Sequence, residues 1–307
     1  MICQDPAKIV NADREVRALQ ALQHPNVITY HMYCTEGSFV YIALDLCRGT
    51  LIDCIDDDKK KDIDGQPLLP NSDNLLVRLT SNQTDTVIVE QDRDWMFKKH
   101  LLQGIAAGLS YLHGGNSSNF IIIHGDLTPQ NVLIKSDESN HYGLKAIISD
   151  FGFCRELTHG ETSISASQAA VGTNGWMARE QLMLNERIST ATDIFAFGCI
   201  AHYVLSPNRA KSIIHPFGTS EKRNKMIEKD KRICYLYENA PRSFIFKGDL
   251  ILADIMIGLC VKTKRTVRPH ADEILSSPFF WGYDKKMLLL EQIFNEYKDN
   301  IQQVEKL

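Results

Sequence analysis

Apolar residues recur at every third or fourth position in several parts of the chain, a spacing typical of amphipathic helices. The strongest case covers residues 95–113, and a glycine pair at 114 and 115 predicts where this helix ends. The same spacing predicts helices over 13–22, 192–205, 250–260 and 271–275. A last apolar stripe covers residues 287–304. It predicts either a helix packed on its own domain or an exposed face that needs a partner or further chain.

Shorter apolar runs predict β-strands. Runs at 27–34 and 39–44 are separated by Thr-Glu-Gly-Ser, which predicts a β-hairpin. We expect further strands over 120–123, 132–134 and 144–148. Residues 53–94 lack a sustained period and contain a dense charge run and two prolines. They predict a surface insertion, either a solvated loop or a charged docking site.

The composition of the 307-residue chain is that of an ordinary globular protein, with 44% apolar and 23% charged residues. A net charge of −4 disfavours a globally basic nucleic-acid binder. The longest strongly apolar stretch, residues 194–205, is too short for a bilayer, which takes about 20 residues, and the first residues do not resemble a secretory signal. Eight scattered cysteines without a C-x-x-C pair disfavour zinc and favour a reduced, cytosol-facing compartment.

Candidate chemistry is concentrated between residues 124 and 198. The sequence His-Gly-Asp-Leu-Thr-Pro-Gln-Asn at 124–131 directly follows a predicted strand, and Asp-Phe-Gly at 150–152 follows another. Transfer of a phosphoryl group needs a carboxylate that accepts the hydroxyl proton, and oxygen ligands for the Mg²⁺ that neutralises the phosphates. Asp126 suits the first task, and Asn131 and Asp150 suit the second.

These motifs resemble those of eukaryotic protein kinases, H-x-D-x-x-x-x-N followed by D-F-G. Three later segments strengthen the resemblance: G-T-N-G-W-M-A-R-E at 172–180, D-I-F-A-F-G at 193–198, and the pair Arg268-Pro269. The resemblance implies an α+β, bilobal protein-kinase-like fold with an incomplete N-lobe sheet and a mainly helical C-lobe. It also implies ATP and Mg²⁺ as cofactors, Asp126 as catalytic base, Asn131 and Asp150 as metal ligands, and a scaffold role for His124, Glu180, Asp193 and Arg268.

A closer resemblance is to the inositol-requiring kinase/endoribonucleases of the unfolded protein response. It rests on D-R-E-V at 13–16, H-P-N-V-I at 24–28, Y-I-A-L-D-L-C at 41–47, G-T-N-G-W at 172–176, H-P-F-G at 215–218 and P-F-F-W at 278–281. It implies a partial N-lobe and hinge over 1–47, a C-lobe over 48–281 that contains the insertion, and the first helix of a ribonuclease-type segment over 282–307.

The family also implies a cellular setting. We expect this chain to be a soluble piece of a sensor on the cytosolic face of the endoplasmic reticulum membrane, with no membrane segment of its own. We expect it to associate with itself as a dimer or higher oligomer. Because the catalytic part of the ribonuclease is missing from the sequence, the chain alone is not expected to cleave RNA.

The same resemblance implies where ATP binds and where phosphate is added. The adenine is expected against the hinge, from Asp45 to Cys47, with Leu44 as gatekeeper, Leu133 as floor, and Glu15 as the helix residue that pairs with a strand lysine. Three serines, Ser163, Ser165 and Ser167, lie where family members autophosphorylate. The alternative for these serines is an unmodified, flexible polar loop.

Four departures from the kinase pattern leave the activity open. The chain has no G-x-G-x-x-G, Lys8 lies too close to Glu15 for the usual strand lysine, Gly125 replaces an arginine, and Thr128 replaces a lysine. Losing one preorganised group that donates to the phosphates typically lowers the rate of an enzyme by about 10²–10³. Three interpretations remain: a serine/threonine kinase that phosphorylates its own activation segment, a pseudokinase whose nucleotide-dependent shape controls dimerisation and a ribonuclease, or an incomplete gene model.

Overall fold

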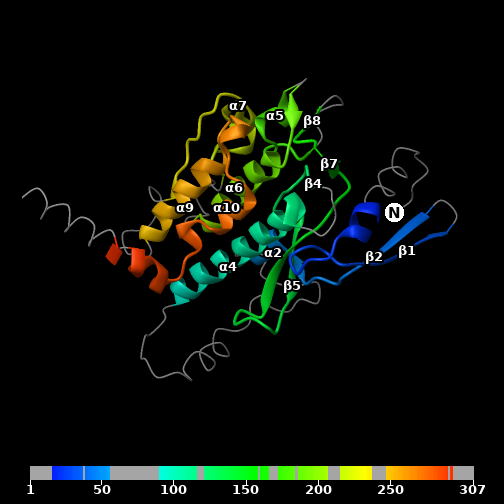
Figure 1. Cartoon of the computed structure of the whole chain (residues 1–307), viewed down its shortest axis with the longest axis horizontal. Coiled ribbons are helices and arrows are strands. Elements are labelled where there is room, and N and C mark those ends of the chain that lie inside the picture. The colour runs from blue at the N-terminus through cyan, green and yellow to red at the C-terminus, as the bar shows by residue number, and fades with distance from the viewer. Residues whose placement is uncertain are drawn as a thin grey trace, which may run out of the picture.

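The computed structural model describes residues 16–36, 39–55, 90–115, 121–157, 160–165, 172–183, 186–206, 215–236, 247–289 and 291–292. They form an α+β fold in which a small antiparallel sheet lies beside a larger, mainly helical part (Figure 1). No helix within these ranges is both long and apolar enough to cross a membrane. The predicted site residues Glu15 and Ser167 lie outside the described residues, as do Lys8 and most of the stripe over 287–304.

The small sheet is the hairpin that the sequence predicts. Strands β1 (Tyr30–Glu36) and β2 (Phe39–Leu44) pair antiparallel. The expected first strand begins three residues too early, because Val27 and Ile28 pair with Ile148 of another sheet instead. Nearly all side chains of β1 are exposed, so this strand adds little to the core. Before the hairpin, residues 16–21 are helical, in agreement with the helix expected over 13–22.

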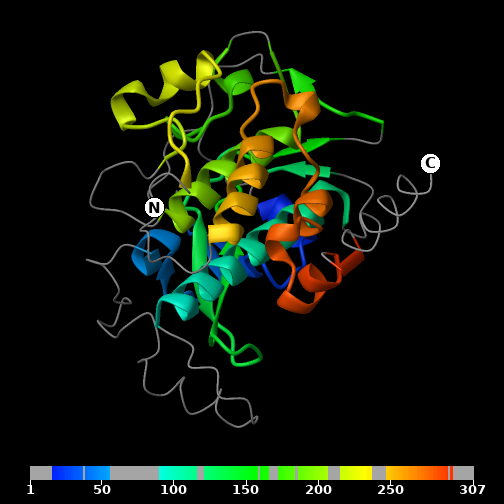
Figure 2. The same cartoon turned by 90° about the vertical axis from the view of Figure 1, so that its left-hand side faces the viewer.

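Helices α4 (Glu90–Ser110), α6 (Ala191–Leu205) and α9 (Lys247–Cys260) form the centre of the molecule (Figure 2). Helix α6 packs against both others, and all of its residues from Thr192 onward are buried. The predicted helix over 95–113 is confirmed, although α4 begins five residues earlier. It is followed by a π-helical turn, η2 (Tyr111–Gly115), in which Gly114 has a φ of 141° that ends the helix.

Shorter elements surround this centre. Helix α10 (Ala271–Leu275) has the predicted bounds, and α5 (Arg179–Leu182), α7 (Ser220–Glu228) and two 3₁₀ turns, η4 (Arg265–Val267) and η5 (Pro278–Phe280), complete this part. The insertion expected over 53–94 is wrong at both ends. Its first residues belong to helix α2 (Leu51–Ile55), and its last belong to α4. The first turn of α4 consists of charged and polar residues, so it shows no apolar spacing from which a helix could be predicted. Residues 56–89 lie outside the described ranges.

The remaining strands are short and frame two loops. Strands β3 (Gly49–Thr50), β5 (Val132–Ser136) and β6 (Leu144–Ile148) form one antiparallel sheet, β4 (Ile121–Ile123) pairs with β7 (Arg155–Leu157), and β8 (Ile164–Ser165) pairs with β9 (Arg187–Ile188). The predicted motif at 124–131 is the loop from β4 to β5. Asp-Phe-Gly lies in the loop from β6 to β7, so the two sheets bring both motifs together.

Residues 26–28 join the start of the chain to the helical part. Asn26 donates from Nδ2 to Ala146 O at 2.9 Å, and its own carbonyl accepts from Ile148 N at 2.9 Å. A Cβ at Gly104 would lie 2.7 Å from Asn26 Nδ2, and one at Gly108 would lie 2.9 Å from Asn26 O. Glycine therefore occurs twice within α4 because the segment before the hairpin passes directly over the helix.

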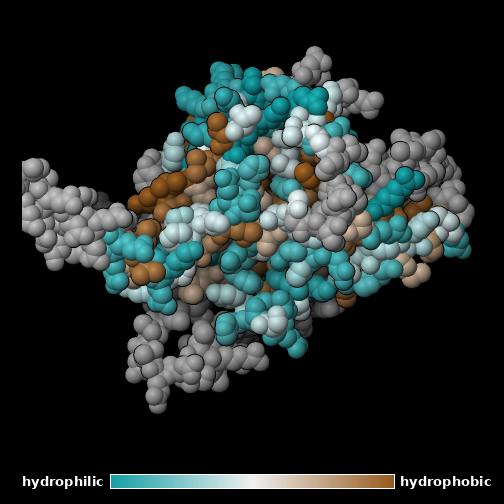
Figure 3. Space-filling model, viewed as in Figure 1, coloured by the Kyte–Doolittle hydropathy of each residue, from teal (hydrophilic) through white to brown (hydrophobic). Residues whose placement is uncertain are grey.

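One face of α9 is apolar and open to solvent. Ile251, Ile255 and Leu259 are spaced by four residues and are each about half exposed, at 50%, 56% and 46%. Figure 3 shows the resulting hydrophobic band along this helix. The opposite face of α9 packs on α6, so the helix is apolar on two sides.

Candidate active site

One buried carboxylate anchors the 124–131 loop. Asp193, in the first turn of α6, is 1% exposed. Its Oδ2 accepts from the backbone N–H of His124 at 2.8 Å and contacts His113 Nε2 at 2.9 Å, while Oδ1 accepts from Gly125 N at 2.9 Å. These three contacts compensate the burial of the charge. They fix the backbone just before Asp126.

His124 links this loop to the segment that precedes Asp150. Its Nδ1 accepts from Asp126 N at 3.3 Å, so Nε2 carries the proton and donates to Ser149 O at 2.9 Å. The fully buried ring also packs against Phe151, with 5.2 Å between ring centroids. The buried imidazole thus sets the spacing between the two acidic residues, Asp126 and Asp150.

The Asp126 carboxylate lies between two donors. Its Oδ1 accepts from Thr173 N at 2.7 Å, and its Oδ2 accepts from Asn131 Nδ2 at 3.3 Å. Asn131 Nδ2 also donates to Asp126 O at 2.8 Å. Because the amide nitrogen of Asn131 makes both contacts, its Oδ1 is the atom left to accept or to bind a metal. The predicted base therefore touches both a predicted metal ligand and the 172–180 segment.

Backbone pairing brings Asn131 and Asp150 to neighbouring positions. Ser149 donates to Asn131 O from its backbone N at 2.9 Å and from its Oγ at 3.0 Å. Asp150 is exposed and has a φ of 63°, a left-handed conformation that is uncommon outside glycine. Carboxylate and amide oxygens are the hard donors that Mg²⁺ prefers, so these two residue types suit the ion implied by the sequence.

The predicted hinge lies where the hairpin meets the three-stranded sheet. Asp45 contacts Lys135 Nζ of β5 at 2.5 Å and His31 Nε2 at 2.9 Å. Partial burial opposes ionisation of Asp45, but hydrogen bonds from Lys135, Thr29 and His31 outweigh it and hold its pKa at about 2. Burial raises the pKa of the half-buried Cys47 thiol, with smaller effects from the neighbouring charges.

Two predicted pocket residues flank this hinge. Leu44 ends β2 and Leu133 lies in β5, and both are partly buried against the main core. Arg48 N donates to Ile134 O at 2.8 Å, which joins the residues after the hinge to β5. Leu44, Asp45, Cys47 and Leu133 thus lie near the junction of the hairpin and the three-stranded sheet.

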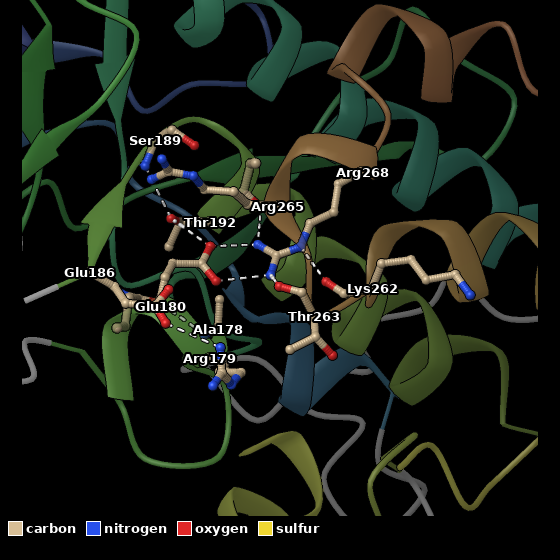
Figure 4. Close-up of polar contacts among 12 residues, drawn as sticks. Ala178, Arg179, Glu180, Glu186, Ser189, Thr192, Lys262, Thr263, Arg265 and Arg268 are labelled. Carbon is tan, nitrogen blue, oxygen red and sulfur yellow. Dashed lines mark hydrogen bonds and ion pairs between the residues drawn. The ribbon is translucent and has the colours of Figure 1, made fainter. Parts of the chain in front are cut away.

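Glu180 and Arg268 form a buried, bidentate ion pair (Figure 4). Arg268 Nη1 lies 2.5 Å from Glu180 Oε1, and Arg268 Nη2 lies 2.9 Å from Glu180 Oε2. The Arg268 side chain is 0% exposed and the Glu180 side chain is 2% exposed. The other three N–H groups of the guanidinium donate to the carbonyls of Lys262, Thr263 and Ala191, at 2.6, 3.1 and 2.8 Å. All five donors of this arginine are therefore used.

The described serines of the predicted phosphorylation segment differ from each other. Ser163 is 8% exposed, and its hydroxyl accepts from Arg187 Nε at 2.8 Å. Ser165, the last residue of β8, is exposed. Ser165 is thus part of a strand pair with β9, whereas Ser163 directly precedes β8.

Sequence analysis missed three residues that shape this region: Lys135 at the hinge, Arg187 beside Ser163, and Gln181. Gln181 Nε2 donates to Gly125 O at 2.7 Å, and its Oε1 accepts from Ala178 N at 3.0 Å. Local patterns could not reveal these roles, since Gln181 and Gly125 are 56 positions apart. Gly125 itself has a φ of 80°, and a Cβ there would lie 3.0 Å from Phe153 O. Any side chain at this position is therefore strained.

A family model described as the protein kinase domain matches residues 4–280. The chain belongs to the protein kinase family. This kinase domain is 32% identical over 286 residues to the human serine/threonine-protein kinase/endoribonuclease IRE2, and 31% identical over 284 residues to ire-1, the serine/threonine-protein kinase/endoribonuclease of Caenorhabditis elegans. It is 28% identical over 314 aligned positions to the Schizosaccharomyces pombe sensor for unfolded proteins in the ER, ire1.

These alignments cover 91%, 92% and 94% of the kinase domain but only 25%, 24% and 25% of the relatives. The chain thus spans about a quarter of their length. The expected fold class and the resemblance to the ER stress sensor family are confirmed.

Proposed function

We propose that this kinase domain transfers the γ-phosphoryl group of ATP to serine or threonine hydroxyls, foremost those of its own activation segment. The observation that carries the proposal is the cluster of Asp126, Asn131 and Asp150, held together by His124 and Ser149. The relatives named as kinases and as a sensor for unfolded proteins support a place in the unfolded protein response, on the cytosolic face of the endoplasmic reticulum membrane.

Each residue of the cluster has a distinct proposed task. Asn131 Oδ1 and the Asp150 carboxylate would hold Mg²⁺, which neutralises phosphate charge when bound. Asp126 accepts the hydroxyl proton of the substrate. Two donors, Thr173 N and Asn131 Nδ2, hold the carboxylate in place.

ATP would lie between the two lobes. We assign the adenine to the hinge from Asp45 to Cys47, between Leu44 and Leu133, and keep Glu15 as the predicted partner of a strand lysine. The proposed lobes are 1–47 and 48–281, followed by the start of a ribonuclease-type segment over 282–307. As in the relatives' names, kinase and endoribonuclease would belong to one longer protein, which would associate with itself through its kinase parts.

Thr128 favours the second candidate, a pseudokinase that binds nucleotide as a scaffold. Its side chain is 2% exposed, and its Oγ1 and backbone O both accept from Asn131 N, at 3.3 and 3.1 Å. It is therefore committed to the loop and does not replace the lysine that usually contacts the γ-phosphate. Such a protein would bind Mg·ATP without transferring phosphate.

Two measurements on the full chain separate these candidates. The first is thermal stability with and without Mg·ATP, since a ligand at 100 times its dissociation constant adds about 2.7 kcal/mol. We expect a stabilisation that needs Mg²⁺ and that Asp150→Ala abolishes. The second is phosphate incorporation followed by mass spectrometry, in which Asp126→Asn should retain ATP binding but lose about 10²–10⁴ in rate.

Asp94→Asn is the matched control, because this exposed carboxylate on α4 pairs with Lys98 in the following turn, away from the site. It should change neither measurement. Binding without incorporation in the unaltered chain would favour the pseudokinase. Absence of both binding and incorporation in a folded chain would refute the proposed function.

A further inference from the structure

The ribbon formed by β8 and β9 brings a serine and an arginine face to face. In this antiparallel pair Ser165 lies directly opposite Arg187, and Ile164 lies opposite Ile188. Side chains of directly opposed residues project from the same face, with Cβ atoms about 4.5–5.5 Å apart. Ser165 and Arg187 are both exposed, whereas both isoleucines are half buried. The polar pair is therefore on the solvent side of the ribbon.

Ser163, which directly precedes β8, holds the Arg187 side chain. It is 8% exposed and lies two residues before Ser165. Arg187 Nε donates to Ser163 Oγ at 2.8 Å, and Nη2 donates to the Ser163 carbonyl. These contacts use two of the five N–H groups of the guanidinium. The guanidinium is thus fixed alongside the position that a group on Ser165 would occupy.

A second arginine adds positive charge at this point. Arg265 of η4 donates from Nη1 to the Arg187 backbone carbonyl. Glu186, the acidic neighbour in sequence, is directed to Arg179 instead, at 3.1 Å. By contrast, Gly125 stands in place of the usual arginine of the 124–131 loop, and its φ of 80° opposes any side chain there.

We propose that Arg187 is the residue that binds a phosphate on Ser165, and that this contact fastens β8 to β9. This inference rests on the proposed function for the source of the phosphate. Ser165 Oγ bonds to the γ-phosphorus of ATP as the bond from that phosphorus to the bridging oxygen of ADP breaks, and the hydroxyl proton goes to a carboxylate base. The phosphate gains a charge-assisted, two-pronged contact with a planar guanidinium, which lysine cannot reproduce.

The test separates binding of the phosphate from its transfer. Phosphoserine is installed at position 165 during synthesis of the full chain, and its second pKa is followed by ³¹P NMR. An exposed phosphoserine titrates near pH 6. A paired guanidinium should lower this pKa by about half a unit to one unit. We also expect slower hydrogen exchange over 160–165 and 186–188 than in the chain without phosphate.

In Arg187→Gln the phosphate pKa should equal that of the same chain unfolded in urea, and the hydrogen-exchange protection should be lost. In Arg187→Lys only part of the pKa lowering and part of the protection should remain. Arg179→Gln, which removes a nearby arginine with a partner of its own, should change neither. An equal phosphate pKa in the unaltered chain and in Arg187→Gln would overturn the proposal. Because the phosphate is installed chemically, this result is independent of whether the chain transfers phosphate.

Discussion

The buried Glu180–Arg268 pair makes a quantitative prediction for Glu180→Gln. The substitution keeps the shape of the side chain but removes its charge, so the guanidinium stays buried without a counter-charge. Glutamine also offers only one acceptor oxygen, whereas Arg268 presents Nη1 and Nη2 to two. Removing one partner of a buried pair costs about 3–5 kcal/mol. This is a large share of the 5–15 kcal/mol that typically separates folded from unfolded chains.

The assay is urea unfolding at pH 7, followed by tryptophan fluorescence and circular dichroism. Glu186→Gln is the matched control, because Glu186 pairs with Arg179 at 3.1 Å and the two side chains are 41% and 36% exposed. An exposed pair of this kind contributes at most about 1 kcal/mol. If Glu180→Gln lowers the free energy of unfolding by no more than Glu186→Gln does, the buried pair does not contribute the stability argued above.

Three further predictions concern other parts of the fold. Gly198→Ala should cost about 1–3 kcal/mol in the same unfolding assay, because its Cβ would lie 2.7 Å from Cys260 Cβ; an unchanged stability would mean that α9 can move away freely. Asp45→Asn should cost about 1 kcal/mol at pH 7 after screening by solvent. Since the folded pKa of Asp45 is lowered to about 2, its contribution is full above about pH 4 and disappears as the pH falls to about 2, so unfolding curves of the two proteins should converge there. Hydrogen exchange should be rapid in the exposed hairpin strands, 30–36 and 39–44; protection equal to that of α6 would contradict this.

The elements that the sequence predicts best are those with a regular, buried apolar face. Strand β6 and helix α10 have the predicted bounds, and α6 begins one residue early. The first five residues of α4 were missed because they are charged or polar and carry no apolar period. Strands β7 to β9 have two or three residues each, too few to show an alternation, and exist only through partners elsewhere in the chain.

Much the same holds for the candidate site. The motif residues Asp126, Asn131 and Asp150 could be named in advance because their spacing resembles a known family. The residues that hold them in place could not be named in advance, because these residues are far away in the sequence and no local pattern links them to the motifs. Lys135, for example, contacts Asp45 across 90 positions. The different settings of Ser163 and Ser165 likewise follow from β9, not from their own surroundings in the sequence.

The junction at Asn26 has a consequence for how the chain folds as it is made. Asn26 bonds to Ala146, 120 residues further along. At a synthesis rate of about 5–20 residues per second, the partner strand emerges roughly 6–24 s after Asn26 itself. Throughout that interval Leu19 and Leu22, which are buried in the finished fold, lack the part of the core that β6 supplies. The segment from Leu19 to Ile28 therefore reaches its final packing only after β6 has been made.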